Sequence, residues 1–219
     1  MFKKIITVAL LVATCSNVVA QSKVDPEYVK VTNERAQKIV NDLKIKSAAD
    51  QLAVRDIIAE QYRSLNKIQD GRDAQIAEAK KNVTDKEKQQ KEVEKLKAAA
   101  DKDIASLHKS YLKKLGKKLN ANQINQVKDG MTYGVLPITV AGYNDMLPNL
   151  TAAQKKYIYD ALVEAREHAM DGGSSKEKHG WFGKYKGRIN NYLSKQGYDL
   201  NKESADWHKR IEEKEKNKK

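Results

Sequence analysis

Residues 151–193 read TAAQKKYIYDALVEAREHAMDGGSSKEKHGWFGKYKGRINNYL, and this stretch indicates the fold class most clearly. Thr151 can cap a helix in which apolar side chains recur at spacings of three and four as far as Ala169. The pattern stops at residues 171–173, and Ser174 followed by Glu177 is typical of another helix start. The second helix places a further apolar and aromatic stripe on one face: Trp181, Phe182, Tyr185, Ile189, Tyr192 and Leu193. The stretch therefore predicts two consecutive amphipathic helices.

The same helical period continues toward the N-terminus. We expect a short helix capped by Thr32 and a longer one that starts at Ser47. About half of residues 70–118 are charged, and Thr84 with Glu87 forms a capping-box pattern near the middle of this segment. Two long helices that meet there predict a charged antiparallel hairpin, an arm over residues 70–118.

The region between the hairpin and residue 151 differs in composition, because it is rich in glycine and proline. Glycines and prolines recur within residues 129–148, at Gly130, Gly134, Pro137, Gly142 and Pro148. Because such residues interrupt helices, they predict an irregular loop with a short extended segment over residues 135–143.

The expected architecture is all-α: a helical bundle with one long charged antiparallel hairpin and an irregular Gly/Pro-containing loop. We expect a linker over residues 21–31 and a single helical domain over residues 32–211, whose part from 120 to 200 is rich in aromatic residues. The Lys/Glu-rich end, residues 212–219, is predicted to be disordered.

The first twenty residues are typical of a secretory signal. Lys3 and Lys4 precede an apolar run over residues 5–13 that is too short to cross a bilayer as a helix, which needs about 20 residues. Small residues at 18–20 then suit cleavage before Gln21. We therefore expect an exported protein, periplasmic or extracellular.

Cys15 is the only cysteine and gives an alternative, a lipid anchor on the mature N-terminus. Thr14 disfavours it, because lipoprotein peptidases prefer Gly or Ala at that position. Cleavage after Ala20 would leave no thiol for disulfides or catalysis, and the net charge would fall by two, from +13 to +11. Since export makes nucleic acid an improbable partner, this charge favours anionic polysaccharide, lipid headgroups or cell-surface polymer. No later segment is apolar enough to span a membrane.

Several long and unusual runs resemble one known family, a secreted bacterial family catalogued as domain of unknown function 3826 and described as sugar-binding. The resemblance rests on four main runs and two short upstream ones: Gln126–Gly134, Gly142–Thr151, Glu164–Asp171, Lys178–Leu193, Glu34–Ala36 and Val54–Asp56. It implies export, one domain across nearly the whole mature chain, and a carbohydrate ligand. It carries over no catalytic or ligand residue.

Residues 179–192 combine rings, cations and amides, the groups that stack on sugar rings and clamp acidic sugars. We expect a pocket between the 129–148 loop and helices spanning 164–192. The candidate ligand residues are Asp129, Tyr133, Tyr143, Glu167, His168, His179, Trp181, Lys184, Tyr185, Arg188, Asn191 and Tyr192. Another interpretation is that the aromatic and aliphatic side chains of this segment form a buried stripe. Burial is favoured for Phe182, Ile189 and Leu193. Glycines within this segment, Gly180, Gly183 and Gly187, predict close approach of another helix or of a ligand, and helix packing is favoured.

The sequence favours binding over catalysis and predicts no cofactor or metal, since no two histidines have ligand spacing. Glu164 and His168 are i,i+4 neighbours that could form a carboxylate–imidazole pair. Two other functions remain open. Repeated Leu-x-x-x-Gln elements at residues 119–123 and 150–154 are compatible with helical-hairpin chaperones of the periplasm, although ordinary capping also explains them. A carbohydrate-active enzyme would use an acid such as Glu167 or Asp129.

Overall fold

The computed structural model describes residues 25–217, which form eight α-helices and no strand within that range. Four helices make the N-terminal part: α1 (Pro26–Asp42), α2 (Ala48–Asn82), α3 (Lys86–Leu115) and α4 (Ala121–Met131). Four more make the C-terminal part: α5 (Val135–Met146), α6 (Ala152–Met170), α7 (Ser175–Lys195) and α8 (Leu200–Lys216). The prediction of an all-α helical bundle is confirmed.

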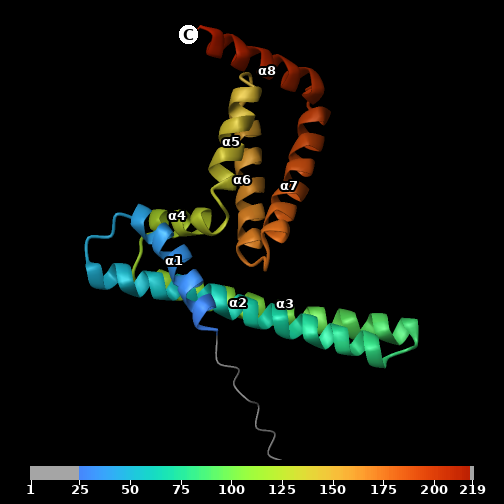
Figure 1. Ribbon diagram of the computed structural model, residues 1–219. Coiled ribbons are helices and arrows are strands. Elements are labelled where there is room, and N and C mark those ends of the chain that lie inside the picture. Colours follow the sequence, from blue (N-terminus) through green and yellow to red (C-terminus); the bar gives the residue numbers. More distant parts are fainter. Residues whose placement is uncertain (1–24, 218–219) are drawn as a thin grey trace, which may run out of the picture.

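Helices α2 and α3 lie side by side as the long antiparallel hairpin, and one end projects well beyond the other helices (Figure 1). Ser47 caps α2 as expected, accepting a hydrogen bond from the amide of Asp50. The cap of α3 was placed one residue too early, because the Asp85 carboxylate, not Thr84, accepts the amide of Lys88. Either side chain suits the position chemically, so sequence alone did not separate them.

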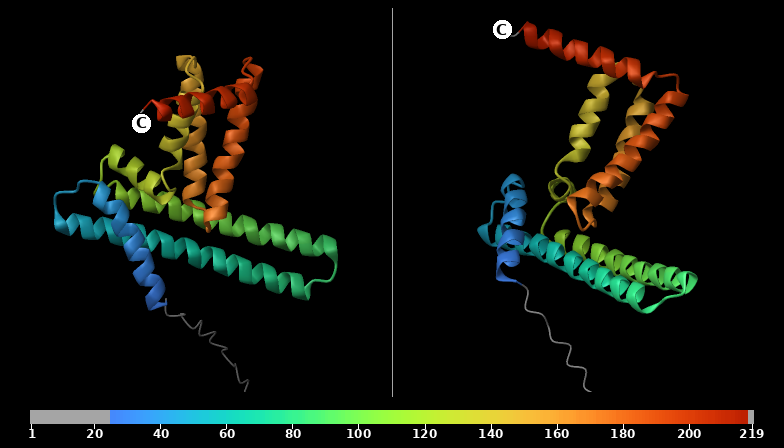
Figure 2. Two further views of the ribbon diagram at one scale, coloured as in Figure 1. Left: turned by 45° about the horizontal axis from the view of Figure 1, so that its top comes forward. Right: turned by 45° about the vertical axis from the view of Figure 1, so that its right-hand side comes forward.

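Helices α5, α6 and α7 stand across the hairpin, and α8 crosses their far end (Figures 1 and 2). Thr151 caps α6 with a capping box through Gln154, and Ser174 caps α7 by accepting the amide of Glu177. The two helices pack antiparallel, so the segment that best predicted the fold forms the centre of this second unit.

The predicted irregular loop with an extended segment at 135–143 is wrong, because α5 occupies residues 135–146. Gly134 adopts a left-handed conformation (φ +65°) that redirects the chain after α4. Pro137 lies in the first turn of α5, where the amide it lacks would have no partner inside the helix. Pro148 follows the helix end. Gly134 and Pro137 therefore lie at the start of a helix and Pro148 lies after its end, although these residue types are typical of helix interruptions.

Both ends of the domain are more helical than predicted. Helix α1 starts at Pro26, capped by Asp25, so most of the expected 21–31 linker is helix. Thr32 is not a cap: it is buried within α1, and its hydroxyl donates to backbone carbonyls one turn earlier. Helix α8 continues to Lys216, through most of the expected disordered tail. The predicted signal at residues 1–20 lies outside the described residues.

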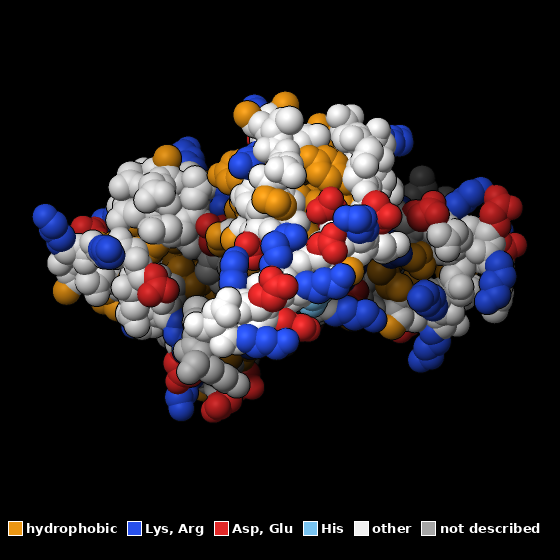
Figure 3. Space-filling model, turned by 90° about the horizontal axis from the view of Figure 1, so that it is seen from above, with side chains coloured by type: hydrophobic (Ala, Val, Ile, Leu, Met, Phe, Trp, Pro, Cys, Tyr) orange, Lys and Arg blue, Asp and Glu red, His pale blue; other side chains and the backbone are white. Residues whose placement is uncertain are grey.

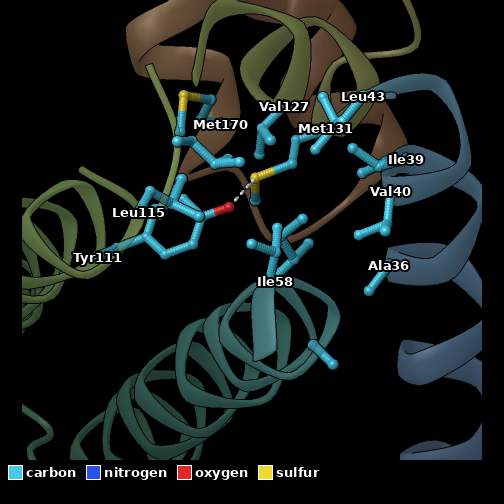
Figure 4. Close-up of a cluster of buried hydrophobic side chains, with 13 residues drawn as sticks. Ala36, Ile39, Val40, Leu43, Ile58, Tyr111, Leu115, Val127, Met131 and Met170 are labelled. Carbon is cyan, nitrogen blue, oxygen red and sulfur yellow. Dashed lines mark hydrogen bonds between the residues drawn. The ribbon is translucent and has the colours of Figure 1, made fainter. Parts of the chain in front are cut away.

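Two separate hydrophobic clusters form the interior. The first joins α1–α4 and includes Ile39, Ile58 and Tyr111, whose hydroxyl donates to the sulfur of Met131 at 3.2 Å (Figure 4). The second joins α5, α6 and α7, and it contains Phe182, Ile189 and Leu193, as predicted. Each unit therefore buries most of its own apolar faces, and Met170 at the end of α6 extends into the cluster of the first unit.

Polar contacts connect the two units. Arg166 on α6 is 3 % exposed and forms an ion pair of 2.7 Å with Asp129 on α4. Asp171, at the end of α6, pairs at 2.8 Å with His108 on α3. The Asp171 hydrogen bond is the main reason that the pKa of His108 is raised. Within residues 25–217, no helix is long and apolar enough to cross a membrane.

Candidate functional site

A cleft of about 570 Å³ opens where the two units meet. Its walls come from α1, α2, the α4–α5 junction, the α6–α7 turn and the first turn of α7. The polar and aromatic part of the lining consists of Tyr28, Arg35, Lys38, Tyr62, Asn66, Gln69, Tyr133, Ser174, Ser175 and Lys178. This volume lies within the range of small-molecule sites, and positions between units are typical of them.

The cleft is lined by three cations, Arg35, Lys38 and Lys178, and by no Asp or Glu among the described residues. Arg35 and Lys38 are exposed on α1, and neither forms an ion pair with any residue of the 25–217 range. Free cations that converge on a concave surface raise the local concentration of anions. The cleft is therefore suited electrostatically to an anionic ligand.

Two of the lining tyrosines keep their phenol protons over a wide pH range. Burial raises the pKa of Tyr62 to about 12 and raises that of Tyr28, and Arg35 opposes both shifts. Arg35 is thus near both phenols. Neutral phenols can donate hydrogen bonds to ligand oxygens and offer ring faces to sugar C–H groups.

Tyr133 holds an unusual backbone conformation at the rim of the cleft. Its φ is +59°, and the following Gly134 is also left-handed. For a residue with a Cβ this region costs roughly 1–2 kcal/mol. Tyr133 is nevertheless 55 % exposed, and its ring stacks on His179 of α7 with centroids 5.5 Å apart. The left-handed backbone at Tyr133 ends α4, because it lets the amide of Gly134 donate to the carbonyl of Asp129 at 2.8 Å.

The N-terminus of α7 forms one end of the cleft. The amides of Ser175 and Lys176 have no hydrogen-bond acceptor within the described chain, and the positive end of the helix dipole lies there. The Glu177 carboxylate accepts a hydrogen bond of 2.7 Å from the amide of Gly173. One carboxylate of the chain itself therefore already lies at this terminus.

The turn before α7 is held firmly against the hairpin. Gln69 on α2 donates to the carbonyl of Asp171 at 2.8 Å, and its side chain lies so close to Gly173 that a Cβ there would collide with it. Lys178, 6 % exposed, donates to the carbonyls of Ala169 and Met170 at the end of α6. Desolvation lowers the pKa of Lys178 to about 8. These contacts fix the amides of α7 relative to α1 and α2.

The predicted ligand residues on α6 and α7 lie together along a different face, where they contact one another. Trp181 stacks on His168 with centroids 4.3 Å apart, and Lys184 lies over the same indole ring. Arg188 lies over the buried ring of Tyr185, and Tyr192 stacks on Tyr157. One face of each of these rings is therefore already covered by a protein group and is not available to a sugar.

The remaining predicted residues are divided between several places. Tyr133 lines the cleft, and its stacking partner is His179. Tyr143 is buried and donates to Asn190, whereas Asn191 is exposed on α7. The two predicted segments, 129–148 and 164–192, supply half of the residues that line the cleft, and the other half come from α1 and α2, which the prediction did not include.

Asp129 and Glu167, the two acids considered for catalysis, both belong to the polar junction between α4 and α6. Asp129 pairs with Arg166, and it also lines a shallower hollow of about 420 Å³ beside the cleft. Glu167 accepts a hydrogen bond of 2.7 Å from Lys128. The expected Glu164–His168 pair is not formed, because Glu164 accepts from the Tyr185 hydroxyl.

The prediction that another helix packs closely on three glycines of α7 is wrong. A Cβ on Gly180, Gly183 or Gly187 would have no atom within 4 Å among the described residues. The close approaches occur instead at Gly130, against Ile39, and at Gly173.

Sequence reasoning missed the cleft residues of α1 and α2. Arg35, Tyr28 and Tyr62 occupy ordinary positions in amphipathic helices, and nothing local distinguishes them from solvated residues. The paired glycines at 172–173 before a serine cap predict a helix boundary, but they do not show that this boundary lines a cleft. Within residues 25–217, no group of three or more His, Cys, Asp or Glu side chains could hold a metal ion.

Comparison with known proteins places the chain in a family. A family model described as protein of unknown function (DUF3826) matches residues 29–213, and the chain belongs to that family. No curated protein matches it.

Proposed function

We propose that this member of the DUF3826 family is an exported binding protein whose cleft receives the acidic end of an oligosaccharide. The observation that carries the proposal is the lining itself: three cations, three tyrosines and no carboxylate among the described residues around about 570 Å³. A uronic acid presents both features that such a lining complements, a carboxylate and a ring with C–H and hydroxyl groups. Export is part of the proposal because residues 1–20 are typical of a secretory signal.

The geometry supports one orientation of the ligand. The carboxylate would lie between the guanidinium of Arg35 and the free amides at the start of α7, where a planar cation and a helix N-terminus both favour an anion. The sugar ring would then extend toward the tyrosines at the rim. In this arrangement the ligand contacts both helical units.

The test is calorimetry with digalacturonate and trigalacturonate, using neutral oligosaccharides of equal length as comparison. Arg35→Gln should weaken binding by roughly 10- to 100-fold, since hydrogen bonds to charged groups contribute about 1.5–3 kcal/mol. Arg188→Gln is the matched control, because Arg188 is an exposed arginine that lies over Tyr185 of its own helix and does not line the cleft. Binding of neutral and acidic sugars with equal affinity, or an Arg35 variant that binds like the native protein, would refute the proposal.

A further inference from the structure

One short segment of the hairpin arm carries only positive charges. Residues 104–120 contain five lysines and no Asp or Glu, whereas residues 70–103 contain nine basic and nine acidic residues. On the face seen from above in Figure 3, acidic and basic side chains are interspersed. Residues 178–198 also contain five basic residues and no Asp or Glu, but the segment 104–120 differs from the rest of the hairpin arm, which balances its charges.

The five lysines belong to the last turns of α3 and the turn that follows it: Lys109, Lys113, Lys114, Lys117 and Lys118. All five are exposed. Lys118 pairs with Asp50 at 2.8 Å, and the other four form no ion pair within the described part of the chain. The neighbouring α1–α2 connection, residues 43–47, contains two exposed lysines, Lys44 and Lys46, and no Asp or Glu. It therefore adds no negative charge beside the C-terminus of α3.

Three of these lysines form a row at i,i+4 spacing. Lys109 and Lys113 lie on one face of α3, roughly 6 Å apart along the axis, and Lys117 continues the spacing in the turn that follows Leu115. Like charges at this spacing destabilise a helix by a few tenths of a kcal/mol per pair. Elsewhere on α3 the same spacing is used for attraction, as in the Glu87–Lys91 ion pair. Lysines near a helix C-terminus gain from its dipole, but that gain fades within about one turn and does not extend to Lys109.

The residues between the lysines indicate which polyanion suits the row. The exposed neighbours are small or polar, Ser106, Ser110 and Gly116, while Tyr111 and Leu115 face the core. A helix that binds a bilayer surface instead exposes an apolar face between its lysines. A row of flexible point charges on a rod suits a linear chain that carries one charge per repeat.

We propose that the row formed by Lys109, Lys113 and Lys117 is a second binding surface, which holds an acidic polysaccharide chain by ionic contacts alone. The surface is separate from the cleft and does not require it. Binding here would be weak per contact, tolerant of sequence along the polymer and strongly dependent on salt.

The experiment uses polygalacturonate as the probe and the full mature chain. The triple variant Lys109→Gln, Lys113→Gln, Lys117→Gln should bind at least tenfold more weakly at low salt. The slope of log K against the logarithm of the salt concentration should become less steep by about two to three, if each contact releases a counterion as on nucleic acids. The matched control is Lys86→Gln, Lys88→Gln, Lys97→Gln, which removes equal charge from exposed arm lysines that form no ion pair within residues 25–217. It should bind like the native chain.

Three outcomes would overturn the inference. One is equal loss in both triple variants, which would mean that net charge alone matters. Another is tighter binding of native protein to phosphatidylglycerol vesicles or to duplex DNA than to polygalacturonate. The third is loss of polymer binding in Arg35→Gln with no loss in the row variant, which would assign all binding to the cleft. Conversely, failure of digalacturonate to bind would refute the cleft proposal without affecting this one.

Discussion

Replacing Lys178 by Met should change how stability depends on pH. The native ammonium is buried beside the cleft, and desolvation lowers its pKa from 10.5 to about 8. The folded protein therefore holds this proton less tightly than the unfolded chain. Between those two pH values the unfolded state binds more protons, so the free energy of unfolding rises with pH in that window.

The magnitude follows from the size of the shift. At 1.36 kcal/mol per pKa unit, the charged form destabilises the fold by roughly 3 kcal/mol below pH 8, and this penalty disappears as the pH approaches 10.5. Methionine has similar length and no charge, so Lys178→Met should lack the rise. The variant loses the hydrogen bonds to Ala169 and Met170, but that loss is nearly constant with pH.

The assay is urea denaturation of both proteins at intervals between pH 7 and pH 10.5. Taking the difference between the two proteins removes the contribution of tyrosines, which ionise in both. The stability of native protein minus that of the variant should grow by roughly 3 kcal/mol across the window. A difference that stays constant would show that Lys178 is not buried as a charged group, and the account of how α7 is held would be wrong.

Three further results are expected. Arg166→Met should lower the free energy of unfolding by roughly 3 kcal/mol by chemical denaturation, because it removes one member of a buried ion pair; a loss below 1 kcal/mol would contradict that pairing. Gly183→Ala should raise the melting temperature, by the equivalent of up to about 1 kcal/mol, since nothing faces it, whereas Gly173→Ala should lower it through collision with Gln69; equal effects would refute the distinction. Because its pKa is raised, the stabilising contribution of His108 is complete below its ordinary pKa of 6.5 and is lost as the pH rises through the raised value. His108→Gln should therefore cost more stability at pH 5.5 than at pH 8.5 in urea titrations, and the reverse order would contradict the pairing.

Local patterns predicted most helices because each helix start carries its own chemistry. Ser47, Asn120, Thr151 and Ser174 all cap helices through a side-chain oxygen, and periodicity supplied the rest. The Leu-x-x-x-Gln elements at residues 119–123 and 150–154 correspond to two of these capping boxes, so ordinary capping accounts for their likeness. Helix α5 was missed because the effect of proline depends on its place within a helix, and the sequence does not show where the helix starts.

The cleft could not be predicted for a different reason. Arg35 and Ser175 belong to helices far apart in the chain, and they line one cleft because contacts between the units, such as that of Gln69 with the α6–α7 turn, hold them there. Composition did indicate aromatic and basic groups in α7, but it could not show that rings such as Trp181 would stack on neighbours of the same unit. Residue types are local information, whereas the availability of a ring face depends on tertiary packing.

The projecting end of the hairpin gives the molecule a marked directional asymmetry. A helix of 35 residues, the length of α2, extends about 52 Å. The N–H bonds of α2 and α3 lie along the hairpin, while those of α5–α7 lie across it (Figure 2). In a weakly aligned sample, the residual dipolar couplings of these N–H bonds should therefore fall into two groups, which would report the angle between the two units in solution.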